Sequence, residues 1–188
     1  DSNAVLYFYR SLGFKDFTLL STGTWVIGFN PALALEKLDQ TRDMLANVSV
    51  DHQPVATARF MGGREYDVIS GSSRIHVTPE MIERVIARRQ MALPSFAEGG
   101  PFAGHKGCWQ GPAAEGEAER AAVATLYIAM MMNEMLEMLG SEKDVIIDGG
   151  LVHNEALLSI LATLRPAQSI YSNADAEGTA MGAAALAF

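Results

Sequence analysis

The sequence predicts an α/β domain with one mixed sheet and helices on its faces. Antiparallel strands are expected first along the chain, and helices and strands then alternate toward its end, which is the pattern of such a domain. A length of 188 residues is enough for one sizeable core. With 49% hydrophobic and 19% charged residues, the composition is that of an ordinary globular protein and argues against global disorder.

The first part of the chain combines a short helix with several strands. A helix is expected at residues 4–12, because apolar residues recur at an approximately helical spacing before Gly13. Short apolar runs separated by turn residues predict the strands, and Pro31 ends the second of them because it has no N–H for the ladder. Residues 36–47 are left open, as an insertion or a short helix. The strands expected here are residues 17–20, 25–29, 48–50 and 55–60.

The rest of the chain is mainly helical. The 93–111 segment is rich in Gly, Pro and aromatic residues and is expected to be an irregular loop. Thr78 and Pro79 are typical of a helix start, and Gly140 is typical of a helix end. The helices expected are residues 64–69, 79–90, 115–139, 154–164 and 175–188, and the strands are residues 145–147 and 169–171.

Charge and cysteine content exclude several function classes. The formal net charge is −8 and no dense Lys/Arg cluster occurs, so no nucleic-acid partner is expected. The most apolar stretch, residues 121–132, is too short to cross a membrane, so no membrane partner is expected either. Cys108 is the single cysteine, which excludes an intramolecular disulfide and favours a reducing, cytoplasmic location.

Three glycine-bearing turns indicate the kind of ligand that the domain binds. They are residues 21–24 (Ser-Thr-Gly-Thr), Gly62-Gly63 before a helix, and residues 148–150 (Asp-Gly-Gly) between a strand and a helix. Glycine lets the backbone approach a ligand closely, and a helix N-terminus favours phosphate. The turns together predict a nucleotide held largely by backbone, although each alone is more often an ordinary tight turn. Neither a Walker A motif nor a Gly-x-Gly-x-x-Gly fingerprint is present.

These turns, in this order and spacing, resemble the C-terminal domain of the FGGY family of carbohydrate kinases, in particular its fuculokinase- and rhamnulokinase-like members. The resemblance covers nearly the whole chain. The order and spacing of the matching segments are specific to the family when taken together, whereas no single segment is specific by itself. The segments that carry it are residues 1–4, 20–25, 58–65, 94–102, 148–154 and 182–184.

The resemblance implies an actin-like (ribonuclease-H-like) ATPase domain. Residues 1–188 would form the C-terminal nucleotide-binding domain of a sugar kinase, and the N-terminal sugar-binding domain would lie outside this chain. The expected ligands are ATP, Mg²⁺ and a ketose, deoxyketose or polyol substrate. The missing lobe of the same enzyme is the expected partner, and the sequence leaves a homodimer open. This chain alone is expected to have no useful sugar kinase activity.

The resemblance also implies which residues contact the nucleotide. Thr24 resembles the residue that contacts the phosphates, and Gly62, with Gly63 beside it, resembles the glycine next to the nucleotide. The adenosine-binding turn contains Gly149 and Gly150, and it is completed by Asn154, which lies four residues after Gly150. None of the four histidines has the spacing of metal ligands, so no protein metal ligand is predicted.

Asp1 resembles the family's catalytic aspartate. In the family, this carboxylate accepts the proton of the sugar hydroxyl while the hydroxyl oxygen attacks the γ-phosphate. Two other interpretations stay open: Asp1 is only an exposed terminal residue, or residues 2–4 are a cloning remnant. Because the chain lacks an initiator Met, we expect it to be a piece of a longer protein.

A second function class fits the same turns. An actin-like module could bind nucleotide in a regulatory or scaffolding role without phosphorylating a sugar. The residues that precede Asp1 would distinguish the two, because a sugar kinase should carry a second phosphate-binding turn and its sugar contacts there.

Overall fold

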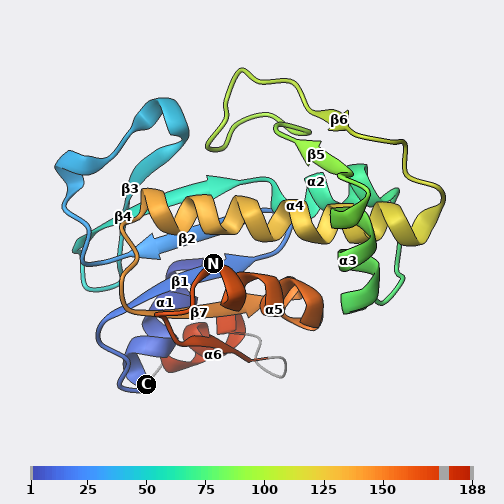
Figure 1. Cartoon of the computed structure of the whole chain (residues 1–188). Coiled ribbons are helices and arrows are strands. Elements are labelled where there is room, and N and C mark those ends of the chain that lie inside the picture. The colour runs from blue at the N-terminus through green and yellow to red at the C-terminus, as the bar shows by residue number, and fades with distance from the viewer. Residues whose placement is uncertain (1, 174–177, 187–188) are drawn as a thin grey trace.

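The computed structural model describes residues 2–173 and 178–186 (Figure 1). It contains one six-stranded mixed sheet in the order β3-β4-β2-β1-β7-β8. Neighbouring strands are antiparallel from β3 to β1, and β1, β7 and β8 are parallel. The strands are β1 (Phe17–Thr22), β2 (Val26–Asn30), β3 (Met44–Val48), β4 (Pro54–Phe60), β7 (Asp144–Gly149) and β8 (Ile170–Ser172).

Helices cover both faces of this sheet (Figure 1). The long α4 (Glu117–Met138) crosses one face together with α2 (Gly62–Ser70), α3 (Pro79–Ala87) and α5 (Glu155–Leu164). The other face carries α1 (Ser2–Ser11) and α6 (Gly178–Ala185). Successive side chains of a strand point to opposite faces of the sheet, so the sheet separates two parts of the core. Leu20 packs toward α4, and its neighbour Leu19 packs toward α1.

The first and last described helices pack backbone to backbone. A Cβ atom at Gly182 of α6 would overlap the carbonyl oxygen of Ala4 in α1. A glycine therefore permits this approach, and any larger residue would force the two helices apart. Val5 and Leu6 on α1 are almost fully buried and anchor the pair to the sheet.

Two expectations are wrong in detail: the strand at residues 48–50 and the irregular loop at residues 93–111. Residues 36–47, left open as an insertion or short helix, contain two 3-10 helices, Leu35–Lys37 and Gln40–Arg42, and most of β3. The strand expected at residues 48–50 is therefore displaced toward the N-terminus. The turn starts at Ser49, whose N–H donates to the carbonyl of Gln53, and pairing with β4 ends at Val48.

The 93–111 segment is also not irregular throughout. Its ends pair as a two-stranded sheet of β5 (Met91–Leu93) and β6 (Cys108–Gln110). Gly111 follows with φ of 85°, and a Cβ there would overlap the carbonyl oxygen of Arg89. The composition predicts the loop between the strands but gives no sign of this pairing, because each strand has only three residues. The last helix was expected at residues 175–188; its described part is α6, and residues 174–177 and 187–188 lie outside the described residues.

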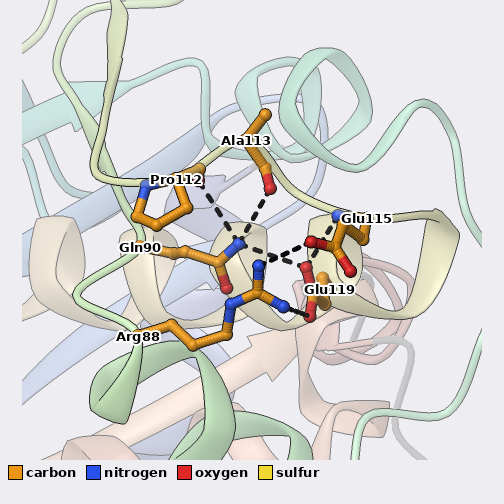
Figure 2. A network of polar contacts seen from close by, with 6 residues as sticks. All are labelled: Arg88, Gln90, Pro112, Ala113, Glu115 and Glu119. Carbon is orange, nitrogen blue, oxygen red and sulfur yellow. Dashed lines mark hydrogen bonds and ion pairs between the residues drawn. The ribbon is translucent and has the colours of Figure 1, made fainter.

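A polar network holds the two ends of the segment that contains β5 and β6 (Figure 2). Arg88, after α3, contacts Glu115 at 2.8 Å and Glu119 of α4 at 2.9 Å. The Gln90 Nε2 donates to Glu119 at 3.1 Å and to the carbonyls of residues 112–113. The backbone N–H of Glu115 donates to Glu119 at 2.7 Å. Glu119 therefore joins the segment before β5, the segment after β6 and the start of α4.

Glu119→Gln is expected to lower the midpoint of thermal unfolding at pH 7 by a few degrees. The hydrogen bond from the Glu115 N–H, with those from Gln90 and the charge of Arg88, holds the pKa of Glu119 below its usual value. Its contribution to folding is thus complete above the usual Glu pKa of about 4.3 and is lost as pH falls through the folded-state pKa. The difference from the unaltered chain should shrink below about pH 4. Thermal unfolding followed by circular dichroism at both pH values tests this.

Glu117→Gln is the matched control. Glu117 lies in the same turn of α4 and is exposed. It should change the midpoint little at either pH. A Glu119→Gln difference that is the same at pH 7 and pH 3.5 would contradict the prediction.

Candidate functional site

The three glycine-bearing turns meet at one edge of the sheet. Strands β1 and β7 are parallel and in register, with Thr22 opposite Gly149, so the segments that follow them leave the sheet side by side. Helix α2 begins two residues after β4, which pairs with β2 up to Val26–Phe60. The edge at which parallel strands end is the usual position of a ligand in α/β sheets.

A cleft of about 610 Å³ opens at this edge. Four of the expected nucleotide residues line it: Thr24, Gly63, Gly150 and Asn154. The turn after β1, the first turns of α2, residues 73–77 and the segment after β7 form its walls. The remaining lining residues are Gly23, Arg64, Tyr66, Asp67, Ser73, Arg74, Ile75, His76, Val77, Leu151 and His153.

The other two expected nucleotide residues, Gly62 and Gly149, are not among the residues that line the cleft. A Cβ atom at Gly62 would overlap the side chain of Val26. Gly149 has φ of 98° and ψ of −163°, and a Cβ there would overlap the carbonyl oxygen of Thr22. Both glycines are therefore needed where segments behind the cleft wall approach closely.

Thr22 bonds the two strand ends to each other. Its hydroxyl donates to the carbonyl of Asp148 at 2.7 Å and accepts from the N–H of Leu151 at 3.1 Å. It is buried, so these bonds are shielded from water. The turns on either side of the cleft are therefore held in a fixed relation before any ligand arrives.

Gly63 brings the start of α2 against the turn after β1. A Cβ at this position would overlap the carbonyl oxygen of Gly23. The N-cap residue, Met61, makes no side-chain cap hydrogen bond. The partial positive charge of the helix N-terminus thus lies beside Thr24 in the cleft, which suits an anionic group such as phosphate.

Asn154 has a structural role in addition to its place in the cleft wall. Its Oδ1 accepts from the N–H of Leu157 at 3.1 Å and caps α5. Its Nδ2 donates to the hydroxyl of Thr125 at 2.9 Å. The amide that the sequence offers for ligand binding is therefore held in one orientation by two helices.

The cleft carries more cationic than anionic side chains. The guanidinium groups of Arg64 and Arg74 line it, against the single carboxylate of Asp67. This local excess contrasts with the net charge of −8 for the whole chain. A polyanionic ligand such as a nucleoside triphosphate fits such a lining.

Sequence reasoning missed the wall formed by Tyr66, Asp67 and residues 73–77. Residues 66 and 67 follow Gly63 by three and four positions, so the helical period places them on the same face of α2. That periodicity could have found them. Residues 73–77 carry no comparable signal, because they have no regular secondary structure.

Asp148, directly before the adenosine-type turn, points into the protein. Its carboxylate is buried and accepts a hydrogen bond from the Tyr9 hydroxyl at 2.7 Å. Burial raises the pKa of Asp148, and the hydrogen bonds from Tyr9 and the Gly178 N–H partly oppose this rise. Asp148 thereby ties β7 to α1 and α6.

Three further expectations concern Asp1, metal ligands and membrane-spanning helices. Asp1, the expected catalytic residue, lies outside the described residues. Within residues 2–173 and 178–186, no group of three or more His, Cys, Asp or Glu side chains could hold a metal ion. None of the described helices is both long and apolar enough to span a membrane.

Comparison with known proteins identifies the family. Residues 14–188 match the model of the family described as "Carbohydrate kinase FGGY, C-terminal domain". The chain belongs to this family. The resemblance expected from the sequence is thereby confirmed. No curated protein sequence matches the chain significantly.

Solved structures of carbohydrate kinases share the fold. A carbohydrate kinase from Novosphingobium aromaticivorans is 32% identical, with a TM-score of 0.84 over 100% of this chain and 42% of that one. A "xyloylose kinase" from Brucella ovis is 20% identical, with a TM-score of 0.68 over 99% and 41% of the two chains. A xylulose kinase from Rhodospirillum rubrum is 13% identical, with a TM-score of 0.60 over 99% and 40%.

These comparisons confirm the expected actin-like (ribonuclease-H-like) ATPase fold for this FGGY domain. The chain spans about two fifths of the length of these sugar kinases. It therefore corresponds to only part of each of those chains.

Proposed function

We propose that this FGGY domain is the ATP-binding lobe of a sugar kinase. The kinase transfers the γ-phosphate of Mg·ATP to a hydroxyl of a ketose, deoxyketose or polyol. The observation that carries the proposal is the cleft in which the turn after β1, the start of α2 and the segment after β7 meet. Membership in a carbohydrate kinase family supports phosphoryl transfer as the reaction.

The lining residues fit the parts of ATP. Thr24 and the N-terminus of α2 at Gly63 hold the phosphates, with Arg64 and Arg74 near enough to offset their charge. Gly150 leaves open space in the cleft, since no atom lies within 4 Å of a Cβ built there. With Asn154 it forms the wall for the adenosine part. Mg²⁺ bound with ATP would offset the charge that develops on the transferred group.

Asp1 supplies the base in this proposal. Phosphoryl transfer needs mostly positioning and charge stabilisation, with a carboxylate that orients the attacking hydroxyl and takes its proton. In this proposal, the N-terminal sugar-binding domain contributes the sugar-binding site and part of the phosphate and Mg²⁺ site. For that reason, we propose that the 188-residue chain alone binds ATP but does not phosphorylate sugars at enzyme-like rates.

Thr24→Val is expected to weaken ATP binding to the chain about 10- to 100-fold, because a hydrogen bond to a charged phosphate contributes about 1.5–3 kcal/mol. Isothermal titration calorimetry with ATP in the presence of Mg²⁺ measures this. Thr163→Val is the control, since Thr163 is exposed on α5 and its hydroxyl bonds to its own helix at Ser159.

A coupled ATP-consumption assay tests the catalytic part of the proposal. It uses the polypeptide that joins this chain to its N-terminal domain, with a panel of ketoses, deoxyketoses and polyols. ATP binding without turnover on any sugar would favour a regulatory actin-like module instead. Failure of the unaltered chain to bind ATP at millimolar concentration would contradict the proposed site itself.

A further inference from the structure

An arginine at the end of the sheet lies on the face opposite the cleft walls. Arg59 is the next-to-last residue of β4 and is paired with Ile27 of β2. Its neighbours Ala58 and Phe60 pack toward α4, so Arg59 points to the face that carries α1 and α6, here called the α1 face. Val55, four residues earlier, packs against α1 on this same face. Arg59 is therefore on the α1 face, close to the edge where the cleft opens.

Two contacts hold the Arg59 side chain in place. Its Nε donates to the Oδ1 of Asp43 at 3.0 Å. Its guanidinium carbon lies 5.1 Å from the centre of the Trp25 ring, which is a cation–π contact. Asp43 is itself fixed, because its Oδ2 accepts from the N–H of Gly100 at 3.0 Å. The protein thus orients the guanidinium from two sides.

The terminal nitrogens of Arg59 keep their donors free. Within residues 2–173 and 178–186, its one hydrogen bond is the bond from Nε, and neither Nη1 nor Nη2 donates to another residue. The side chain is 43% exposed, so a ligand can reach it. An oriented guanidinium with two free terminal nitrogens presents a planar fork of donors, and such a fork matches the oxygens of a phosphate group.

Arg59 also lies next to the turn assigned to the phosphates. Trp25, over which the guanidinium lies, directly follows Thr24. The N–H of Gly23 donates to the carbonyl of Trp25 at 2.8 Å and closes this turn. The cleft opens on the side of the turn where α2 and α5 lie, and Arg59 lies on the other side. A phosphate chain that extends past Thr24 toward the α1 face therefore meets Arg59.

The proposed reaction requires the phosphate chain to extend in this direction. Helix α1 begins at Ser2, and the Nδ2 of Asn3 donates to Asn47 of β3 at 3.3 Å on the α1 face. Asp1, the base in the proposed function, directly precedes this helix in the sequence. The γ-phosphate has to come within reach of the hydroxyl that this base orients. It must therefore cross the end of the sheet from the cleft to the α1 face, and Arg59 lies on that path.

We propose that Arg59 binds the γ-phosphate of the nucleotide and stabilises its charge during transfer. The inference rests on the proposed function and adds a catalytic residue to it, with Asp43 and Trp25 as the positioning residues. As the sugar oxygen bonds to the γ-phosphorus and the bond to ADP breaks, the hydroxyl proton passes to Asp1 and Arg59 offsets the charge on the phosphoryl oxygens. Because the other two phosphates lie at Thr24 and the N-terminus of α2, this contact exists with ATP and not with ADP.

Isothermal titration calorimetry of the 188-residue chain with Mg·ATP and with Mg·ADP tests this contact. Arg59→Gln removes the charge and the fork of donors. It should weaken ATP binding about fivefold or more, the effect of a hydrogen bond to a charged group, and leave ADP binding unchanged. Arg59→Lys keeps the charge but loses the paired donors, so its loss of ATP affinity should be smaller. Unchanged ADP binding also shows that each variant is folded.

Arg10→Gln is the matched control. Arg10 contacts Asp51 at 3.3 Å, as Arg59 contacts Asp43, and its side chain is 31% exposed. Asp51 lies in the turn between β3 and β4, at the end of the sheet away from the cleft. Arg10→Gln should therefore bind both nucleotides as the unaltered chain does. In the polypeptide that includes the sugar-binding domain, Arg59→Gln should also lower kcat about 10²-fold, whereas Arg10→Gln should not.

The outcomes separate this inference from the proposed function. If the unaltered chain binds ATP and Arg59→Gln binds it equally well, the inference is wrong and the proposed function stands. If Arg59→Gln weakens ATP and ADP binding equally, Arg59 only supports the turn after β1 and the inference is also wrong. If the unaltered chain binds neither nucleotide, the proposed function fails, and the inference fails with it.

Discussion

Gly149→Ala is expected to lower the free energy of unfolding by about 3 kcal/mol or more. Gly149 has φ of 98° and ψ of −163°, a backbone conformation that is almost restricted to glycine. An added Cβ would also overlap the carbonyl oxygen of Thr22, which is part of the sheet and cannot swing away. Strain and steric overlap therefore act together. Urea unfolding of the purified chain measures the loss.

The adjacent residue provides the control. Gly150 has no atom within 4 Å of an added Cβ, so Gly150→Ala should change the free energy of unfolding by no more than about 0.5 kcal/mol. Because Gly150 lines the cleft, the added methyl group should instead weaken ATP binding. Equal stability of the two variants would contradict the structural role assigned to Gly149. Unchanged ATP affinity in Gly150→Ala would count against the proposed adenosine wall.

Asp1→Asn is expected to lower kcat about 10²- to 10⁴-fold, the usual contribution of general base catalysis. Asparagine has nearly the same shape but cannot accept the proton of the sugar hydroxyl. The KM for ATP should change little, because the proposed nucleotide contacts come from Thr24, Gly63, Gly150 and Asn154. Steady-state kinetics on the polypeptide that includes the sugar-binding domain measures both quantities.

Asp16→Asn is the matched control for the removal of one carboxylate. Asp16 is exposed and lies just before β1, at the sheet edge opposite the cleft. It should leave kcat unchanged. Full turnover by Asp1→Asn would mean that another group takes the proton, and Asp1 would then have no catalytic role.

Local patterns account for most of the fold that the sequence predicts. The short apolar runs at residues 17–20 and 145–147 identify two central strands correctly. The long helix is also correct to within two residues at its start, because α4 is long and strongly apolar. The pairing of β5 with β6 was missed, since it depends on contacts across the loop and not on any local period.

The candidate site was predictable only in part, for a related reason. A glycine indicates that another group lies close to the backbone, but the sequence does not show whether that group belongs to the protein or to a ligand. Gly149 meets the backbone of Thr22, whereas its neighbour Gly150 faces the open cleft. Thr125 gave no signal at all, because its hydrogen bond with Asn154 joins segments that only the tertiary structure brings together.

The contact between Gly182 and Ala4 has a consequence for the substitutions that this domain tolerates. Asp1 directly precedes α1 in the sequence, and the residue that lets α1 keep its place lies near the other end of the chain. The helix that follows the proposed catalytic base is thus held in place by a residue from the last described helix. In the proposed kinase, a larger residue at Gly182 should therefore lower turnover more than it weakens ATP binding in the cleft.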